Sequence, residues 1–188
     1  MRYLGKKSVS QVVSKWLSIL WYGSMAGAAL ILIGVFVANR NLEGFGLTIR
    51  GGLKIRVSPE YITPGFDYKK YFGLLLLSVL FMIPLYMAAI YQLRGLFREF
   101  VRNRPFNKEN ARRIRIVGWC VMASWLVDNV LGAALSWTIA RNVQVPGVEL
   151  STNLFPRLTG LFLGLIIMVL SEVFAEAARI KEEQDLTI

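Results

Sequence analysis

Histidine is absent from the 188-residue chain, and cysteine occurs once, as Cys120. Histidine is the commonest proton shuttle and the commonest metal ligand, so its absence removes the usual residue for both tasks. A single cysteine forms no disulfide within the chain. The sequence also lacks the motifs of nucleotide-binding loops, serine hydrolases and zinc proteases. We therefore expect a protein that is not an enzyme, with no catalytic residue, cofactor or metal.

Charged residues are scarce as well, at 18% of the chain against 55% hydrophobic residues. A soluble domain averages about 25% charged residues. Several runs without charge are long enough to cross a bilayer, which takes about 20 apolar residues in a helix. The sequence therefore predicts an all-α, polytopic membrane protein with one four-helix domain over residues 1–188. The four transmembrane helices are expected at residues 16–38, 71–93, 115–140 and 157–178, the charge-free part of the last ending before Glu172.

The positions of lysine and arginine predict the orientation of the chain. Of the 22 such residues, most lie in the N-terminal segment, around the loop 94–114 and in the tail 179–188. The positive-inside rule places these segments, and hence both termini, in the cytoplasm. Basic segments at a membrane attract anionic lipids, which are therefore the first expected partner. Direct binding of nucleic acid is not expected, because the basic loop contains no recognisable base-reading module.

The predicted outer loop, residues 39–70, contains a strand pattern. Residues 46–57 read GLTIRGGLKIRV, in which apolar and polar residues alternate on both sides of Gly51 and Gly52. Two alternating runs around a Gly-Gly pair are typical of a β-hairpin. We expect a small extracytoplasmic hairpin between the first two spans. It is either a lid over the helix ends or a receptor surface for a ligand or peptide.

The loop 94–114 is predicted to be a capped turn between two long helices. Apolar residues recur at helical spacing up to Val101, and Pro105 ends this pattern. Asn107 is suited to cap the next helix, and Glu109 in its first turn favours the helix dipole. The tail continues the last span, where Glu176 and Arg179 are spaced to form a pair. These features are explained without a partner, although the loop and the tail are also suited to docking one.

Asp128 is the one charged residue deep inside a predicted span, and Asn129 follows it. An Asp at the bilayer centre costs about 2.5–3.5 kcal/mol on insertion scales, so it should face the bundle or a wet cavity. Ser124, one turn earlier, is placed to hydrogen-bond with it. Two interpretations stay open: an intramembrane proton or cation site, or polar contacts that hold helices together.

Two Gly-x-x-x-Gly pairs occur in the predicted spans, at Gly23 with Gly27 and at Gly160 with Gly164. Such pairs allow helix backbones to approach closely. They serve packing within a bundle more often than dimerisation, so they predict no oligomeric state.

Two motifs carry a family resemblance. The first reads PFNKEN over residues 105–110, and the second reads KEEQDLTI over residues 181–188. Together with the four-span layout, they resemble a bacterial family of four-helix integral membrane proteins of unknown function. Members of that family are often encoded beside a small Cro/CI-type helix-turn-helix regulator. The resemblance implies a protein of the bacterial inner membrane that controls or sequesters such a regulator.

These observations lead to one functional hypothesis with two alternatives. The leading one is a regulatory scaffold whose central loop and acidic tail dock a cytoplasmic partner, such as a helix-turn-helix transcription regulator. The first alternative is a small-solute or proton-coupled transporter that uses Asp128, and the second is an immunity protein that resists a membrane-active peptide through its hairpin. The residues expected to dock the partner are Arg112, Arg113, Arg115, Glu182, Glu183 and Asp185.

Overall fold

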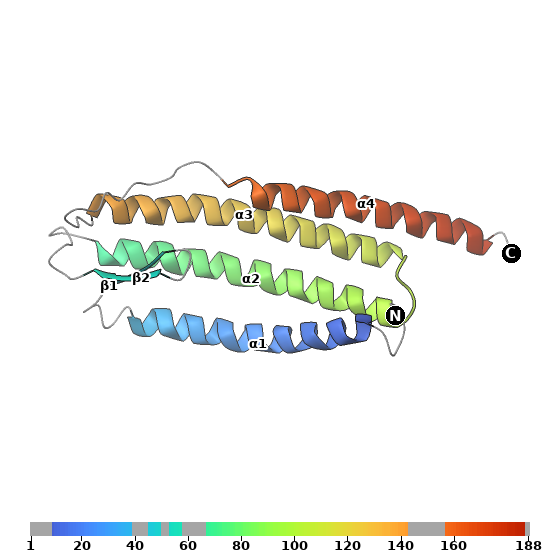
Figure 1. Cartoon of the computed structure of the whole chain (residues 1–188), viewed down its shortest axis with the longest axis horizontal. Helices are drawn as coiled ribbons and strands as arrows, with labels where there is room; N and C mark the ends of the chain where they lie inside the picture. The colour runs from blue at the N-terminus through green and yellow to red at the C-terminus, as the bar shows by residue number, and fades with distance from the viewer. Residues whose placement is uncertain (1–8, 39–44, 50–52, 58–66, 143–156, 187–188) are drawn as a thin grey trace. The chain divides into compact units, whose positions relative to one another are not determined.

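The computed structural model describes residues 9–38, 45–49, 53–57, 67–142 and 157–186. These residues form four long helices and two short strands (Figure 1). The prediction of an all-α chain with four helices is confirmed at this level. The helices are α1 (Val9–Ala38), α2 (Tyr68–Val101), α3 (Lys108–Asn142) and α4 (Thr159–Leu186).

Among the described residues, three helices are long and apolar enough to cross a membrane. The candidate spans are Lys69–Val101 in α2, Lys108–Asn142 in α3 and Thr159–Gln184 in α4. The last predicted span, which Glu172 interrupts in sequence, is therefore among them. The helix α1 is not among them, so a first span at residues 16–38 stays a prediction.

The strands β1 (Phe45–Ile49) and β2 (Leu53–Val57) pair in antiparallel orientation. Phe45 lies opposite Val57, and Ile49 lies opposite Leu53. The connecting residues 50–52 and the side chains of both strands lie outside the described part of the chain. A hairpin on the outer side of a membrane therefore stays a prediction.

Contacts between residues group the chain into two compact units. Unit 1 consists of residues 1–28, 81–126 and 157–188, and unit 2 consists of residues 29–80 and 127–156. The helices α1, α2 and α3 contribute to both units, whereas the described part of α4 belongs to unit 1 alone. Unit 1 contains the turn between α2 and α3, and unit 2 contains the opposite ends of these two helices.

Within unit 1, α3 and α4 touch through glycines. A Cβ atom added to Gly118 would lie 3.3 Å from the Gly164 carbonyl oxygen, and one added to Gly164 would lie 3.3 Å from the Gly118 oxygen. A Cβ atom on Gly160 would lie 2.9 Å from Cβ of Trp125. The close approach predicted for Gly160 and Gly164 is thus confirmed. For Gly23 and Gly27 the prediction is wrong within the described residues, because an added Cβ atom meets nothing within 4 Å.

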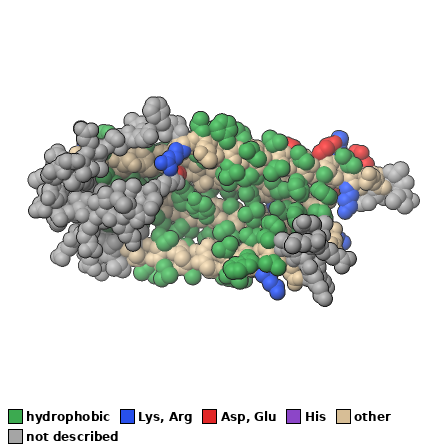
Figure 2. Space-filling view, in the orientation of Figure 1, with side chains coloured by type: hydrophobic (Ala, Val, Ile, Leu, Met, Phe, Trp, Pro, Cys, Tyr) green, Lys and Arg blue, Asp and Glu red, His purple; other side chains and the backbone are tan. Residues whose placement is uncertain are grey.

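The helix α4 has small residues on its inner face and large apolar residues outside. Ser171 and Ala178 are almost completely buried. Phe162, Ile166 and Val169 are each more than half exposed, and hydrophobic side chains cover much of the surface in view (Figure 2). This distribution is typical of a membrane helix, because lipid solvates large apolar side chains while small residues let helices approach.

Candidate docking surface

The turn between α2 and α3 is fixed by two asparagines. The Asn107 side chain caps α3, because its Oδ1 accepts the backbone N–H of Asn110 at 2.6 Å. Asn110 is fully buried, and its Nδ2 donates to the carbonyl oxygens of Arg104 at 3.1 Å and Pro105 at 2.9 Å. Asn103, with φ at 58°, allows the chain to reverse after α2. The predicted cap is confirmed, and the Asn110 side chain links the turn to the first turn of α3.

Aromatic rings join this turn to α4. The Phe106 ring of the turn lies 5.6 Å from the Phe174 ring, measured between centroids. The Phe100 ring, at the end of α2, stacks on Phe174 at 6.3 Å with an angle of 5° between the planes. Ring pairs at these separations add to the energy of burying their apolar area. Phe174 therefore holds the end of α2 and the start of α3 against the same part of α4.

Two ion pairs connect the basic start of α3 with the acidic end of α4. Arg115 Nη2 lies 2.6 Å from Glu172 Oε1, and Lys108 Nζ lies 2.6 Å from Glu182 Oε2. All four side chains are at least 46% exposed, so each pair contributes only about 0.2–1 kcal/mol to stability. Most of the acidic side chains in view lie on α4 (Figure 2). We call these two pairs together the α3–α4 clasp.

The other two predicted docking residues on α3 differ in how far their side chains are exposed. The Arg112 side chain is 73% exposed, with its Nη1 4.0 Å from Glu109. Arg113 is only 23% exposed, and its Nε lies 3.3 Å from the same carboxylate. The Arg113 guanidinium also rests on Gly95 of α2, where a Cβ atom would overlap it. Arg112 is therefore available at the surface, whereas Arg113 is a packing residue.

On α4, Glu183 lies 3.8 Å from Arg179, and the predicted pair between Glu176 and Arg179 is confirmed at 2.6 Å. Asp185 lies within α4, but its side chain is outside the described residues. Sequence reasoning missed Lys108 and Glu172 as partners in the clasp. No local signal identifies them, because each pairs with a residue far away in the chain.

The predicted intramembrane polar residues lie in α3. The Ser124 hydroxyl donates to the Val121 carbonyl oxygen at 2.9 Å, within its own helix. Asp128 is exposed at the surface of unit 2, and Asn129 is partly buried. Among the residues that the structure describes, no group of three His, Cys, Asp or Glu side chains is placed to hold a metal ion.

The apolar helices and the outward-facing large side chains of α4 define a helical membrane protein. Residues 54–188 match a family described as "Protein of unknown function (DUF2975)". The match covers more than half of the chain, which therefore belongs to the DUF2975 family. Membership of a family of unknown function, predicted from the two motifs, is confirmed. Comparison with curated proteins gives no match, and comparison with solved structures gives none either.

Proposed function

We propose that this protein is a non-enzymatic scaffold of the bacterial inner membrane that docks a cytoplasmic regulatory protein. The docking surface is formed by the start of α3, residues 108–115, and the end of α4, residues 172–186. One observation carries the proposal: the α3–α4 clasp brings the two segments of the predicted docking face together. The two segments lie far apart in the sequence, and nothing in the sequence alone indicated that they would be in contact.

The charges on this surface suit a protein partner. Arg112 and Glu183 present opposite signs on neighbouring helices, with side chains 73% and 68% exposed. Arg98 and Arg104, near the same turn, are exposed and form no ion pair within the described residues. Mixed charge on a fixed backbone gives specificity and fast association with a complementary surface. Arg98 and Arg104 also favour contact with anionic lipid headgroups.

The orientation and the partner class complete the proposal. Both termini and the turn between α2 and α3 face the cytoplasm, as the positive-inside rule requires. In this arrangement α1 is a fourth span, and the strands β1 and β2 lie on the outer side. The partner is a Cro/CI-type helix-turn-helix transcription regulator, which the resemblance of the PFNKEN and KEEQDLTI motifs supports. Release of the regulator from the membrane would then carry the signal.

Crosslinked pull-down from native membranes tests the docking surface. We expect the full chain to recover a cytoplasmic DNA-binding protein and Arg112→Glu to reduce its recovery about tenfold or more, because a central charged contact is reversed. Deletion of residues 181–188 should reduce it similarly. Lys69→Glu, which also reverses one exposed cation but at the far end of α2, is the matched control and should leave recovery unchanged. Equal recovery with all four proteins would refute the docking surface.

The second candidate function, a small-solute or proton-coupled transporter, rests on Asp128, whose side chain is exposed within the candidate span of α3. If the protein is a scaffold, Asp128→Asn should leave partner recovery unchanged, and proteoliposomes should show no proton or solute flux. The measurement is flux into vesicles that contain the purified protein, compared with the variant. Flux that Asp128→Asn abolishes would instead establish a transporter, because removing the charge leaves the shape of the side chain almost unchanged.

A further inference from the structure

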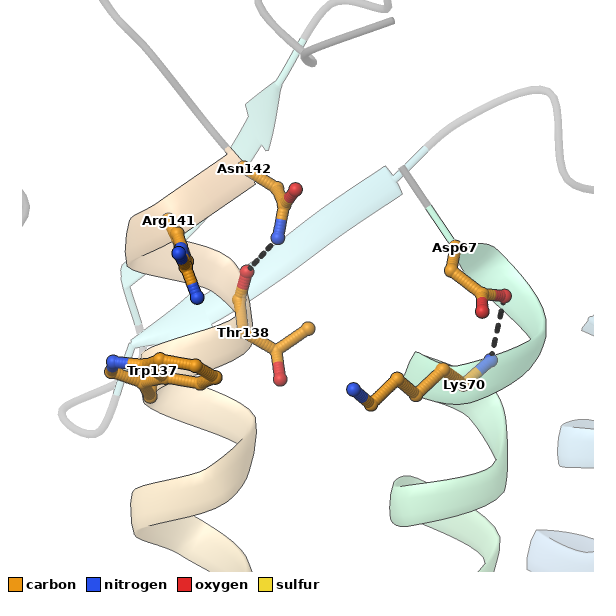
Figure 3. A pocket seen from close by; sticks show the side chains of 6 residues that line it. All are labelled: Asp67, Lys70, Trp137, Thr138, Arg141 and Asn142. Carbon is orange, nitrogen blue, oxygen red and sulfur yellow. Dashed lines mark hydrogen bonds between the residues drawn. The ribbon is translucent and has the colours of Figure 1, made fainter. Parts of the chain in front are cut away.

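A polar cavity lies between the first turn of α2 and the last turns of α3, within unit 2 (Figure 3). Its volume is about 330 Å³, at the lower end of the range of small-molecule sites. The docking surface uses none of its residues. The lining side chains are Asp67, Lys70, Trp137, Thr138, Arg141 and Asn142.

Two cations from different helices face this cavity. The Lys70 side chain extends from α2 toward α3 (Figure 3). The Arg141 guanidinium stacks over the Trp137 ring, 4.9 Å from its centroid. Stacking uses the flat face of a guanidinium and leaves the N–H groups at its edge available to an acceptor. Neither Lys70 nor Arg141 forms an ion pair with any residue that the structure describes.

The other polar groups of the cavity have partners in their own helices. Asp67 Oδ1 accepts the Lys70 backbone N–H at 3.0 Å, which caps α2. The Thr138 hydroxyl donates to the Ala134 carbonyl at 2.8 Å, and Asn142 Nδ2 donates to the Thr138 carbonyl at 2.7 Å. Two cations and one carboxylate give the cavity a net positive charge, so its chemistry favours an anion.

The cavity also lies at the ends of two helices that are candidate membrane spans. The candidate span of α2 begins at Lys69, and that of α3 ends at Asn142, so one end of each helix lies beside the cavity. Tryptophan is enriched at the boundary between acyl chains and headgroups, which the ends of membrane-spanning helices reach. We propose that the cavity binds the phosphate group of an anionic phospholipid headgroup. Lys70 and Arg141 bind the phosphate oxygens, and Trp137 orients Arg141.

Native mass spectrometry of the full chain in non-ionic detergent tests this site. The probe is dihexanoyl phosphatidylglycerol, titrated alone and against inorganic phosphate as competitor. We expect saturable binding of one lipid. Lys70→Gln and Arg141→Gln should each weaken it about tenfold, because each removes a charge-assisted hydrogen bond. Asp67→Asn should strengthen binding, since the amide oxygen still caps α2 while the repelling charge is gone.

Lys69→Gln is the matched control, because Lys69 lies next to Lys70 in sequence but does not line the cavity. It should change the affinity less than twofold. The conservative variants Lys70→Arg and Arg141→Lys keep the charge and should retain most of the binding. This comparison separates loss of the site from loss of the fold.

The outcomes distinguish the source of the phosphate. Competition by inorganic phosphate only at high excess supports the lipid. Binding of inorganic phosphate as tight as that of the lipid overturns the lipid as ligand and identifies a site for a soluble phosphate. If Lys69→Gln weakens binding as much as Lys70→Gln, or if neither variant weakens it, the cavity is not the site and the proposal is wrong.

Discussion

Asn110→Leu is expected to lower the free energy of unfolding by about 3 kcal/mol, which corresponds to about 10 °C in unfolding temperature for a chain of this size. The Asn110 side chain is fully buried and donates to the Arg104 and Pro105 carbonyl oxygens. Leucine donates no hydrogen bond, so both carbonyl oxygens lose the partner that the buried Asn110 amide provides. An acceptor left without its partner beside an apolar side chain costs about 1–3 kcal/mol.

The unfolding temperature is measured from the reactivity of Cys120. It is the one cysteine of the chain, and it is buried, so a fluorogenic maleimide reacts with it as the protein opens on heating. Asn103→Gly is the control, because Asn103 is exposed and glycine adopts its positive φ freely. The control should change stability by a few tenths of a kcal/mol. If Asn110→Leu unfolds at the same temperature as the control, the two hydrogen bonds do not hold the turn.

This turn shows what the sequence was able to predict. The end of the second helix near Pro105 and the cap at Asn107 depend on residues close together in the chain, and both are present. Long runs without charge likewise predicted the helices α2, α3 and α4, because the requirement to satisfy backbone groups in lipid acts on each segment separately. Local chemistry was sufficient wherever the structure depends on local contacts.

Contacts between distant segments were not predictable in the same way. Lys108 and Glu182 form an ion pair although neither residue carries a signal that selects the other. Gly118 touches α4 without belonging to a Gly-x-x-x-Gly pair, whereas Gly23 and Gly27 form such a pair and touch nothing among the described residues. Spacing within one helix indicates which residues share a face, but not which face another helix covers. For the same reason, Arg113 was expected at the surface although it packs on Gly95.

The contact between α3 and α4 leads to the second large effect: Gly164→Leu is expected to lower the free energy of unfolding by about 3 kcal/mol. Overpacking a close contact costs about 1–3 kcal/mol, and here the helix backbones already touch at Gly118 and Gly164. The new side chain would overlap the Met122 side chain, so Met122 must shift or α3 and α4 must move apart. The measurement is again the temperature at which Cys120 becomes reactive.

Gly132→Leu is the matched control, because Gly132 lies in α3, the helix that Gly164 contacts, but a Cβ atom added to Gly132 meets nothing within 4 Å. Replacing a glycine that has free space around it within a helix should leave stability unchanged or raise it slightly, since glycine is a poor helix former. Adding Met122→Ala to Gly164→Leu should recover part of the loss, because the smaller side chain makes room at the contact. If Gly164→Leu and Gly132→Leu unfold at the same temperature, close packing of α3 on α4 does not stabilise unit 1.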